Sequence, residues 1–310
     1  MAFLIHVCAM SDSLALQDTS NQDTSNPIPG RSLQADAMRR LMRNRAAMTS
    51  LCLLSLITLA CLIGPYFLPW RLDEVDYTAF QAPPNFATAH YFGTEANGRD
   101  MLVRTLYGGQ ISLLVGLVAS LVSLVIGVFY GAMAGYIGGR ADNVMMRIVD
   151  ILYSLPFMFV VILLMVFLGR SIVLMFIGIG AVEWLDMARI VRGQTLSLKR
   201  KEFIEAAEAC GVSSFAIITR HIIPNTLSPV IVYVTLTVPR VILLESFLSF
   251  IGLGVQEPMT SWGVLVSEGA ANMETSPWML WFPALFLALT LFCLNFIGDG
   301  LRDAFDPKDR

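Results

Sequence analysis

Apolar runs of close to 20 residues constrain this chain more than any other feature of its sequence. The hydrocarbon core of a bilayer is about 30 Å thick, and a helix needs about 20 apolar residues to cross it. The 310-residue chain is 55% hydrophobic and 15% charged, whereas soluble domains carry about 25% charged residues. The sequence therefore predicts an all-α, polytopic membrane protein with six transmembrane helices. We place the six spans at residues 46–65, 111–134, 148–169, 171–188, 228–253 and 277–298.

Basic residues are distributed unevenly between the segments that connect these runs. Among the 21 Lys and Arg residues, only Arg71, Arg99, Arg104 and Arg170 fall on one side, and Arg240 lies within a run. The others fall on the opposite side, which also holds both termini. Because Lys and Arg accumulate in cytoplasmic loops, we expect both termini in the cytosol. Four tryptophans are then expected near the outer membrane interface: Trp70, Trp262, Trp278 and Trp281.

The residues before the first span differ from the rest in composition. Residues 1–30 contain the pentapeptide QDTSN twice in tandem, and such polar sequence cannot bury a core, so we expect a disordered extension. The first ten residues are apolar, as in a signal peptide. They have neither the basic segment that precedes such an apolar run nor a cleavage site after it, which argues against a signal peptide. Residues 31–45 have the pattern of an arginine-rich amphipathic helix suited to the anionic inner membrane surface, although the arginines could simply flank the first span. Residues 46–310 are predicted to form one transmembrane domain.

A charged segment, residues 199–224, separates the fourth and fifth apolar runs. Its first part, from Glu202, favours a short helix that ends at Gly211, because glycine readily adopts the left-handed conformation that follows many helix ends. Ser213 or Ser214 is suited to cap a second short helix. Small side chains in the first helix would let another protein approach its backbone closely. An ordinary amphipathic surface loop is the alternative interpretation.

The pattern formed by Glu205, Ala206, Ala207, Gly211 and Pro224 resembles the EAA loop of ABC-transporter permeases. It departs from that motif at a usual isoleucine, which is a histidine in this chain. The resemblance implies a cytoplasmic coupling loop that docks on an ATP-hydrolysing partner subunit. Pro224 is also expected to mark the end of the second helix, since proline interrupts a helix interior.

Three further segments resemble the dipeptide, oligopeptide and nickel permease family of ABC importers. They are the run from Phe92 to Leu113, which contains GTEANGRD; the run from Glu245 to Gly263, which contains ESFLSFIGLG and SWG; and the tail from Gly298 to Pro307. Glu95 and Glu257 stand where the family usually has Asp and Pro. Runs at Asn44, at Leu196 and at the C-terminus are most similar to the oligopeptide branch, and the resemblance covers about residues 31–310.

This resemblance implies the type I ABC importer architecture, in which the chain forms half of a heterodimeric channel in the bacterial inner membrane. The implied partners are a sister permease, two ATPase subunits and an extracytoplasmic peptide-binding protein, with a peptide as substrate and no nucleic acid. No G-x-x-x-x-G-K-[ST] motif occurs in the sequence, so ATP hydrolysis is expected in partner subunits. A permease for dipeptides, nickel or antimicrobial peptides is the alternative within the family. A secondary transporter, which usually shows repeated halves, is the alternative outside it.

Groups suited to catalysis or metal binding are few in the outer segment between the first two runs. Thr94, Glu95 and Asp100 lie there, but no His, Cys or metal-ligand set accompanies them. We therefore expect these three residues to cap a short outer helix. The three histidines are scattered along the chain, and no cysteine falls in a segment placed outside. We expect no catalytic residue, metal, cofactor or disulfide.

Small residues recur at every fourth position in the second apolar run: Ala119, Ser123, Gly127, Gly131 and Gly135. Such a stripe lets two helix backbones approach closely in lipid, where packing drives helix association. A helix contact is therefore expected along this face. The sequence leaves open whether the neighbouring helix belongs to this chain or to a partner.

Prolines fall within or beside two of the predicted spans. Pro156 in the third span, and Pro229 and Pro239 in the fifth, are expected to kink their helices. Kinked helices occur both along transport pathways and in purely structural positions. The prolines therefore do not distinguish a helix that lines the pathway from a helix with a structural role.

Arg240 is the basic residue nearest the middle of any predicted span. A charge there costs on the order of 3 kcal/mol, so the side chain should face protein or water. Two interpretations are open: Arg240 pairs with an acid on the sister permease, or it lines the translocation path and contacts the peptide. We favour the path and name Glu245 as the second candidate path residue. The two are rotated by about 140° on a regular helix, which disfavours a pair between them.

Overall fold

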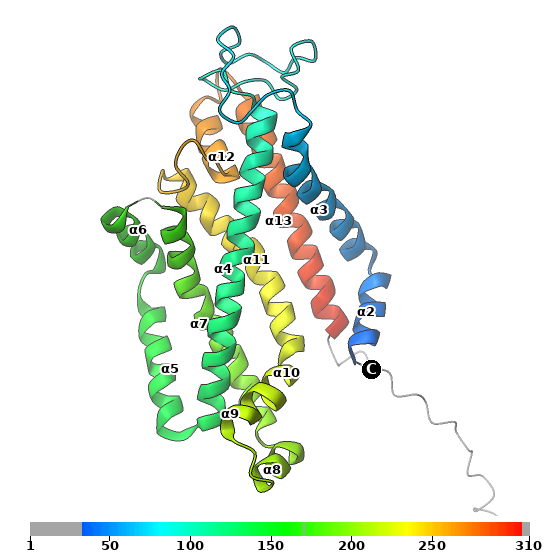
Figure 1. The fold of residues 1–310 in the computed structure, drawn as a ribbon, viewed down its shortest axis with the longest axis vertical. Helices are drawn as coiled ribbons and strands as arrows, with labels where there is room; N and C mark the ends of the chain where they lie inside the picture. The colour runs from blue at the N-terminus through cyan, green and yellow to red at the C-terminus, as the bar shows by residue number, and fades with distance from the viewer. Residues whose placement is uncertain (1–32, 170, 306–310) are drawn as a thin grey trace, which may run out of the picture. The chain divides into compact units, whose positions relative to one another are not determined.

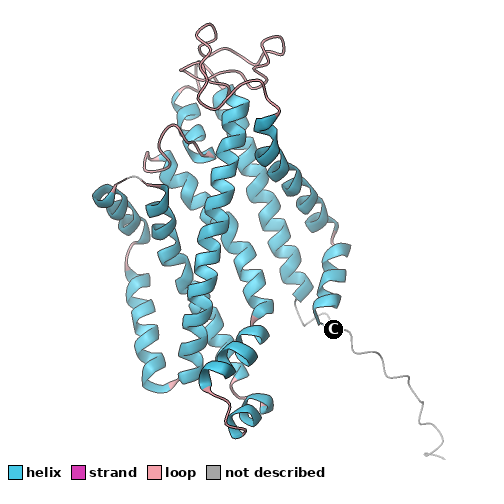
Figure 2. Ribbon diagram, viewed as in Figure 1, coloured by secondary structure: helices cyan, strands magenta, loops and turns pink. Residues whose placement is uncertain are grey.

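Helices account for most of the computed structural model, which describes residues 33–169 and 171–305 (Figures 1 and 2). No strand occurs in these ranges, which confirms the all-α prediction. Helix α2 (Leu33–Arg43) matches the short helix expected within residues 31–45; its place on the membrane surface stays a prediction. It begins in a first unit, residues 1–36, and the helices that follow belong to a second unit, Ala37–Arg310. The predicted extension, residues 1–30, lies outside the described part.

Four of the described helices are long and apolar enough to cross a membrane. The number of candidate spans rises to five if a bent pair of helices is counted as one span. The four are α3 (Arg45–Ile63), α4 (Met101–Ile137), α11 (Leu227–Phe250) and α13 (Trp278–Phe305), and the pair is α5 (Gly139–Ser154) with α6 (Phe157–Leu168). Length and composition therefore do not reproduce the predicted six. The remaining predicted span corresponds to α7 (Ile172–Leu198), which contains Glu183, Asp186, Arg189 and Arg192 and is too charged to be identified by composition.

Two of the helices continue well beyond the apolar runs that predicted the spans. Helix α4 begins at Met101, well before residue 111. At this start, the Asp100 carboxylate accepts a hydrogen bond from the Val103 N–H at 2.9 Å. Asp100 thus caps a long helix, not the short outer helix that we expected. Helix α7 continues past residue 188 to Leu198, and Arg192 on this extension pairs with Asp142 on α5 at 2.5 Å.

The third predicted span, residues 148–169, is broken at Pro156 into α5 and α6, which meet at a bend of 75°. Leu155 is extended, with φ −73° and ψ 136°. A residue before proline avoids the helical region because it clashes with the ring, and proline itself offers no N–H to continue the ladder. Pro239, by contrast, lies inside α11 without ending it.

The small residues of α4 pack against α7 of the same chain, which answers the question that the sequence left open. Helix α4 runs along α7 and α11, and α13 runs along α3 and α11 (Figure 1). A Cβ at Gly127 would lie 2.5 Å from the Met187 Cβ, and one at Gly131 would clash with the Ala188 carbonyl oxygen. Only glycine lets the two backbones approach this closely.

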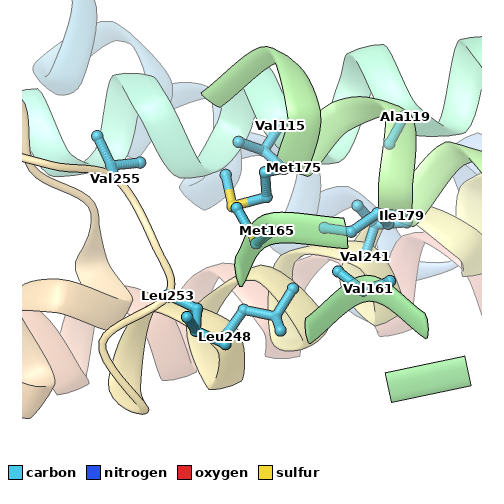
Figure 3. Close-up of a cluster of buried hydrophobic side chains, with 10 residues drawn as sticks. All are labelled: Val115, Ala119, Val161, Met165, Met175, Ile179, Val241, Leu248, Leu253 and Val255. Carbon is cyan, nitrogen blue, oxygen red and sulfur yellow. The ribbon is translucent and has the colours of Figure 1, made fainter. Parts of the chain in front are cut away.

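A buried apolar cluster joins α6 and α7 to α4 and α11 (Figure 3). Val115 and Ala119 of α4 belong to this cluster with Met165 of α6 and Met175 of α7. The cluster anchors α6 to the bundle although the helix is bent away from α5. Its other members are Val161, Ile179, Val241, Leu248, Leu253 and Val255.

An additional helix, α12 (Trp262–Ala271), lies between α11 and α13, in a segment that we expected to be loop. It packs against α11 and α13. Trp262 is fully buried, and its Nε1 donates to the Thr105 carbonyl oxygen at 2.9 Å. The depth of Trp262 relative to the membrane stays a prediction, but its ring is enclosed by protein and does not face lipid. Its ring fills the protein interior at the junction of α4 and α12.

The contact between α4 and α7 predicts a specific loss of stability in Gly131→Ala. The added methyl group meets the backbone of α7, and overpacking of this kind costs about 1–3 kcal/mol. Gly193→Ala on α7 is the matched control, because nothing lies within 4 Å of a Cβ there and both variants gain the same helix propensity. The melting temperature of the detergent-solubilised chain should fall for Gly131→Ala and not for Gly193→Ala. Equal melting temperatures would contradict the contact.

Candidate functional site

The first half of the charged segment 199–224 folds as predicted. Helix α8 (Glu202–Ala209) is followed by Gly211, whose φ of +74° lies in the left-handed region. The Val212 N–H donates to the Ala207 carbonyl oxygen at 3.1 Å and closes the helix end. Gly211 is therefore required by the backbone at this corner.

The second half of the segment is longer and less regular than predicted. Ser213 caps α9 (Ser214–Ile217), and a π-helical turn (Ile218–Ile222) then leads into α10 (Ile223–Asn225). We expected Pro224 to mark the end of the second helix, and this prediction is wrong. Pro224 lies in the first turn of α10, where the helical backbone continues. A proline is tolerated in a first turn, where its missing N–H would have no partner in the helix.

The segment has a buried apolar side and an exposed side. Its isoleucines, Ile204, Ile217, Ile218 and Ile222, are buried against the ends of α4, α7 and α11. The Tyr136 hydroxyl of α4 donates to Glu208 at 2.9 Å and adds a polar anchor.

The residues of the EAA pattern lie mainly on the exposed side of this segment. Glu205, Ala206, Gly211 and Pro224 are exposed, and Ala207 is half-buried. Two large apolar side chains are exposed beside them, Phe203 and Phe215, the latter with 72% of its surface exposed. The segment is thus attached to the bundle by one side and offers small and apolar groups on the other.

Arg240 lies near the middle of α11 and pairs with two acids on α7 of the same chain. Its Nη1 is 3.2 Å from Asp186 Oδ2, and its Nε is 3.8 Å from Glu183 Oε1. The side chain of Arg240 is 55% exposed, whereas that of Glu183 is 4% exposed. The intramembrane charge therefore has partners within this chain, an arrangement that neither of our two interpretations included.

Glu245, the second candidate path residue, is fully buried among serines. Its carboxylate accepts hydrogen bonds from Ser249 Oγ at 2.7 Å and from Ser112 Oγ of α4 at 3.1 Å. Ser112 Oγ in turn accepts from the Trp262 N–H at 3.2 Å. Burying a carboxylate is costly unless hydrogen bonds compensate it, and these bonds join α4, α11 and α12. Glu245 has no exposed surface for a peptide in this conformation, so the structure supports a structural role.

An ion-pair network fixes the opposite end of α4 from the charged segment. Arg104 is 2% exposed and pairs with Glu95 and, at 2.8 Å, with Glu268 of α12. Arg99 also pairs with Glu95 and donates to Glu257 at 2.6 Å. The Arg99 hydrogen bond and charge hold the pKa of Glu257 below its usual range.

The polar residues of the outer segment are used in structural contacts. Thr94 Oγ1 donates to the Ala79 carbonyl oxygen at 2.6 Å, while Glu95 is ion-paired and Asp100 caps α4. His90 is buried, with Asp100 2.9 Å from its Nδ1 and Asp76 3.3 Å from its Nε2. The expectation that no histidine accompanies Asp100 is therefore wrong. These polar residues hold the outer segment together by contacts among themselves.

Glu183, Asp186 and Glu268 were not selected as functional residues from the sequence. A signal for the first two exists, because ionisable residues within a membrane span usually mark a functional site. In the sequence, these two acids shorten the apolar part of the fourth predicted span, residues 171–188. Glu268 gives no comparable signal, since its pairing with Arg104 depends on the fold.

Two family models match the chain. One, described as binding-protein-dependent transport system inner membrane component, matches residues 127–310. The other, described as N-terminal TM domain of oligopeptide transport permease C, matches residues 32–84.

Similar proteins cover nearly the whole chain. The oligopeptide transport system permease protein OppC of Haemophilus influenzae is 59% identical over 283 residues, 91% of each chain. OppC of Escherichia coli K12 is also 59% identical over 283 residues, covering 91% of this chain and 94% of that protein. The dipeptide transport system permease protein DppC of Bacillus subtilis is 44% identical over 295 residues, 95% of this chain and 92% of that protein.

A helix bundle with four helices long and apolar enough to cross a membrane, or five spans with the bent pair, defines the described part as a multi-pass membrane protein. The chain belongs to the family of inner-membrane components of binding-protein-dependent transport systems, the permease subunits of ABC importers.

The buried network at Arg104 predicts a large loss of stability in Arg104→Met. Methionine keeps much of the length of the side chain, but Glu95 and Glu268 lose their partner, and breaking a buried ion pair costs about 3–5 kcal/mol. Arg189→Met is the control, because Arg189 and Asp150 form an exposed pair, and such pairs contribute about 1 kcal/mol or less. The free energy of unfolding, measured in detergent, should separate the two variants. Equal losses would show that the Arg104 network is not a stabilising element.

Proposed function

We propose that this chain forms half of the translocation pathway of an ATP-driven oligopeptide importer. The observation that carries the proposal is the exposed EAA pattern at Glu205, Ala206 and Gly211, on a segment fastened to the ends of α4, α7 and α11. A movement imposed on such a segment by a partner would be transmitted directly to those helices. We infer that this segment is the coupling loop.

The loop must lie in the cytosol to meet an ATPase subunit. We infer six crossings, with α5 and α6 as one bent crossing and α7 as another, so that both termini are cytoplasmic. This agrees with the packing of Gly300 near the end of α13 against Ala47 near the start of α3, because those two ends then lie on one side. The ion-paired outer segment would face the other side and meet a binding protein.

The expected partners are a sister permease, two ATPase subunits and an extracytoplasmic peptide-binding protein. ATP hydrolysis would belong to the ATPase subunits, which the absence of a phosphate-binding motif in this sequence supports. Oligopeptides are the proposed cargo, because the relatives with 59% identity are named as oligopeptide permeases. Dipeptides are the second candidate, supported by the B. subtilis relative at 44% identity.

Gly211→Asp tests the coupling role of the loop. No atom of this chain lies within 4 Å of a Cβ at Gly211, so the substitution adds bulk and charge only where a partner would dock. The assembled transporter, reconstituted with its ATPase subunits and binding protein, should lose most peptide uptake or hydrolyse ATP without uptake.

Gly139→Asp is the matched control for this test. Gly139 is also exposed, has a φ of +58° and has nothing within 4 Å of its Cβ, so both variants carry a similar left-handed backbone cost, roughly 1–2 kcal/mol. Uptake should be retained in the control. Normal coupled uptake by Gly211→Asp, or equal loss in both variants, would remove the loop from the proposal.

A further inference from the structure

A cavity of about 180 Å³ lies beside the intramembrane charges. Glu183, Asp186 and Arg240 supply its polar lining, and Tyr153 and Leu244 contribute to the rest. One water needs roughly 10–15 Å³ of such volume, so the cavity has room for a group much larger than a single water. Its polar residues lie near the middle of α7 and α11, at the depth where ionisable residues usually serve function.

The charges at this cavity are not balanced, because two carboxylates face one guanidinium. Arg240 contacts both acids, but its 3.8 Å approach to Glu183 Oε1 is too long for a hydrogen bond. Glu183 Oε2 is buried and has no hydrogen-bond partner among the residues that the structure describes. An uncompensated buried carboxylate oxygen is costly, so Arg240 compensates Glu183 only in part.

We propose that this cavity binds the protonated amino terminus of a peptide in transit, with Glu183 and Asp186 as the acceptors. The proposal rests on the proposed function, since it assigns the contact to the peptide that the permease would carry. An ammonium group offers three donors and one positive charge, which complements a cavity where two carboxylates share one guanidinium. Every peptide with a free amino terminus presents this group regardless of its sequence.

The charge of the site disfavours the peptide carboxylate that we first considered for Arg240. A carboxylate would meet a guanidinium already paired with Asp186 at 3.2 Å, and it would add a third negative charge. A metal ion also fits poorly, because no group of three or more His, Cys, Asp or Glu suited to a metal occurs in the described ranges. Both observations favour an ammonium group over a carboxylate or a metal ion.

A second cavity, of about 130 Å³, adjoins the first and has an apolar lining. Leu152, Leu155 and Val182 line both cavities. An amino-terminal residue bound by its ammonium group in the first cavity could therefore place an apolar side chain in the second.

The test compares ATP-dependent uptake of two peptides that differ only at the amino terminus, one free and one acetylated. The complete transporter in proteoliposomes is supplied with the same saturated binding protein throughout, so that a change of preference between permease variants arises in the permease. The wild-type chain should prefer the free peptide by about tenfold or more, as expected for a charged hydrogen bond. Glu183→Gln should reduce that preference to within about twofold of equality.

Asp142→Asn is the matched control, because Asp142 also pairs with an arginine of α7 but does not line the cavity. Its preference for the free peptide should equal that of the wild type, whatever its absolute rate. An unchanged preference in Glu183→Gln, or an equal loss in Asp142→Asn, would overturn the assignment. Failure of the wild-type transporter to import any peptide would instead refute the proposed function.

A second measurement leaves the acids intact, in case Glu183→Gln does not fold. Peptides carry a small photoreactive diazirine residue at either the first or the last position, and mass spectrometry locates the adducts on the wild-type chain. The amino-terminal probe should label Val182 or Leu244 in the cavity walls, and the carboxy-terminal probe should not. Labelling of these residues by the carboxy-terminal probe alone would contradict the proposal.

Discussion

The close approach of α4 to α7 is the contact on which the rest of this structure depends. Glycines at 127 and 131 bring the two backbones together, which hydrophobic side chains in lipid would not achieve, since lipid solvates them equally well. This contact fixes α7, and α7 carries both acids that meet Arg240 and the end from which the coupling loop begins. The loop isoleucines then pack on the same two helices.

Charged residues occupy three levels of the bundle, and the environment at each level decides their role. At the outer end, Arg104 is enclosed by Glu95 and Glu268 and fixes α12 to α4. At mid-depth, Arg240 only partly compensates Glu183, and a cavity remains beside them. At the inner end, Arg192 and Asp142 hold α7 against α5. The balanced clusters stabilise the fold, whereas the unbalanced cluster is the one for which we propose a ligand.

Local chemistry explains what the sequence predicts well and what it does not. Gly211, Ser213 and the helix from Glu202 were predictable because each depends on a backbone preference within a few residues. The length of α7 and the existence of α12 were not, since both depend on partners distant in the chain. Glu245 belongs to the second kind: its motif resemblance was clear, but its burial among serines of two helices requires the fold. The partners of Arg240 could not be predicted either, because they lie on α7.

For the proposed coupling role, residues 199–224 and the outer segment must lie on opposite sides of the membrane. Asn97 and Ser213 are both exposed, so each can be replaced by a single cysteine in a chain whose native cysteines are changed to serine. Intact spheroplasts are then treated with a membrane-impermeant maleimide, with and without prior permeabilisation. We predict that Asn97→Cys reacts in intact spheroplasts and that Ser213→Cys reacts only after permeabilisation. Labelling of Ser213→Cys in intact spheroplasts would contradict the orientation and, with it, the coupling role of the loop.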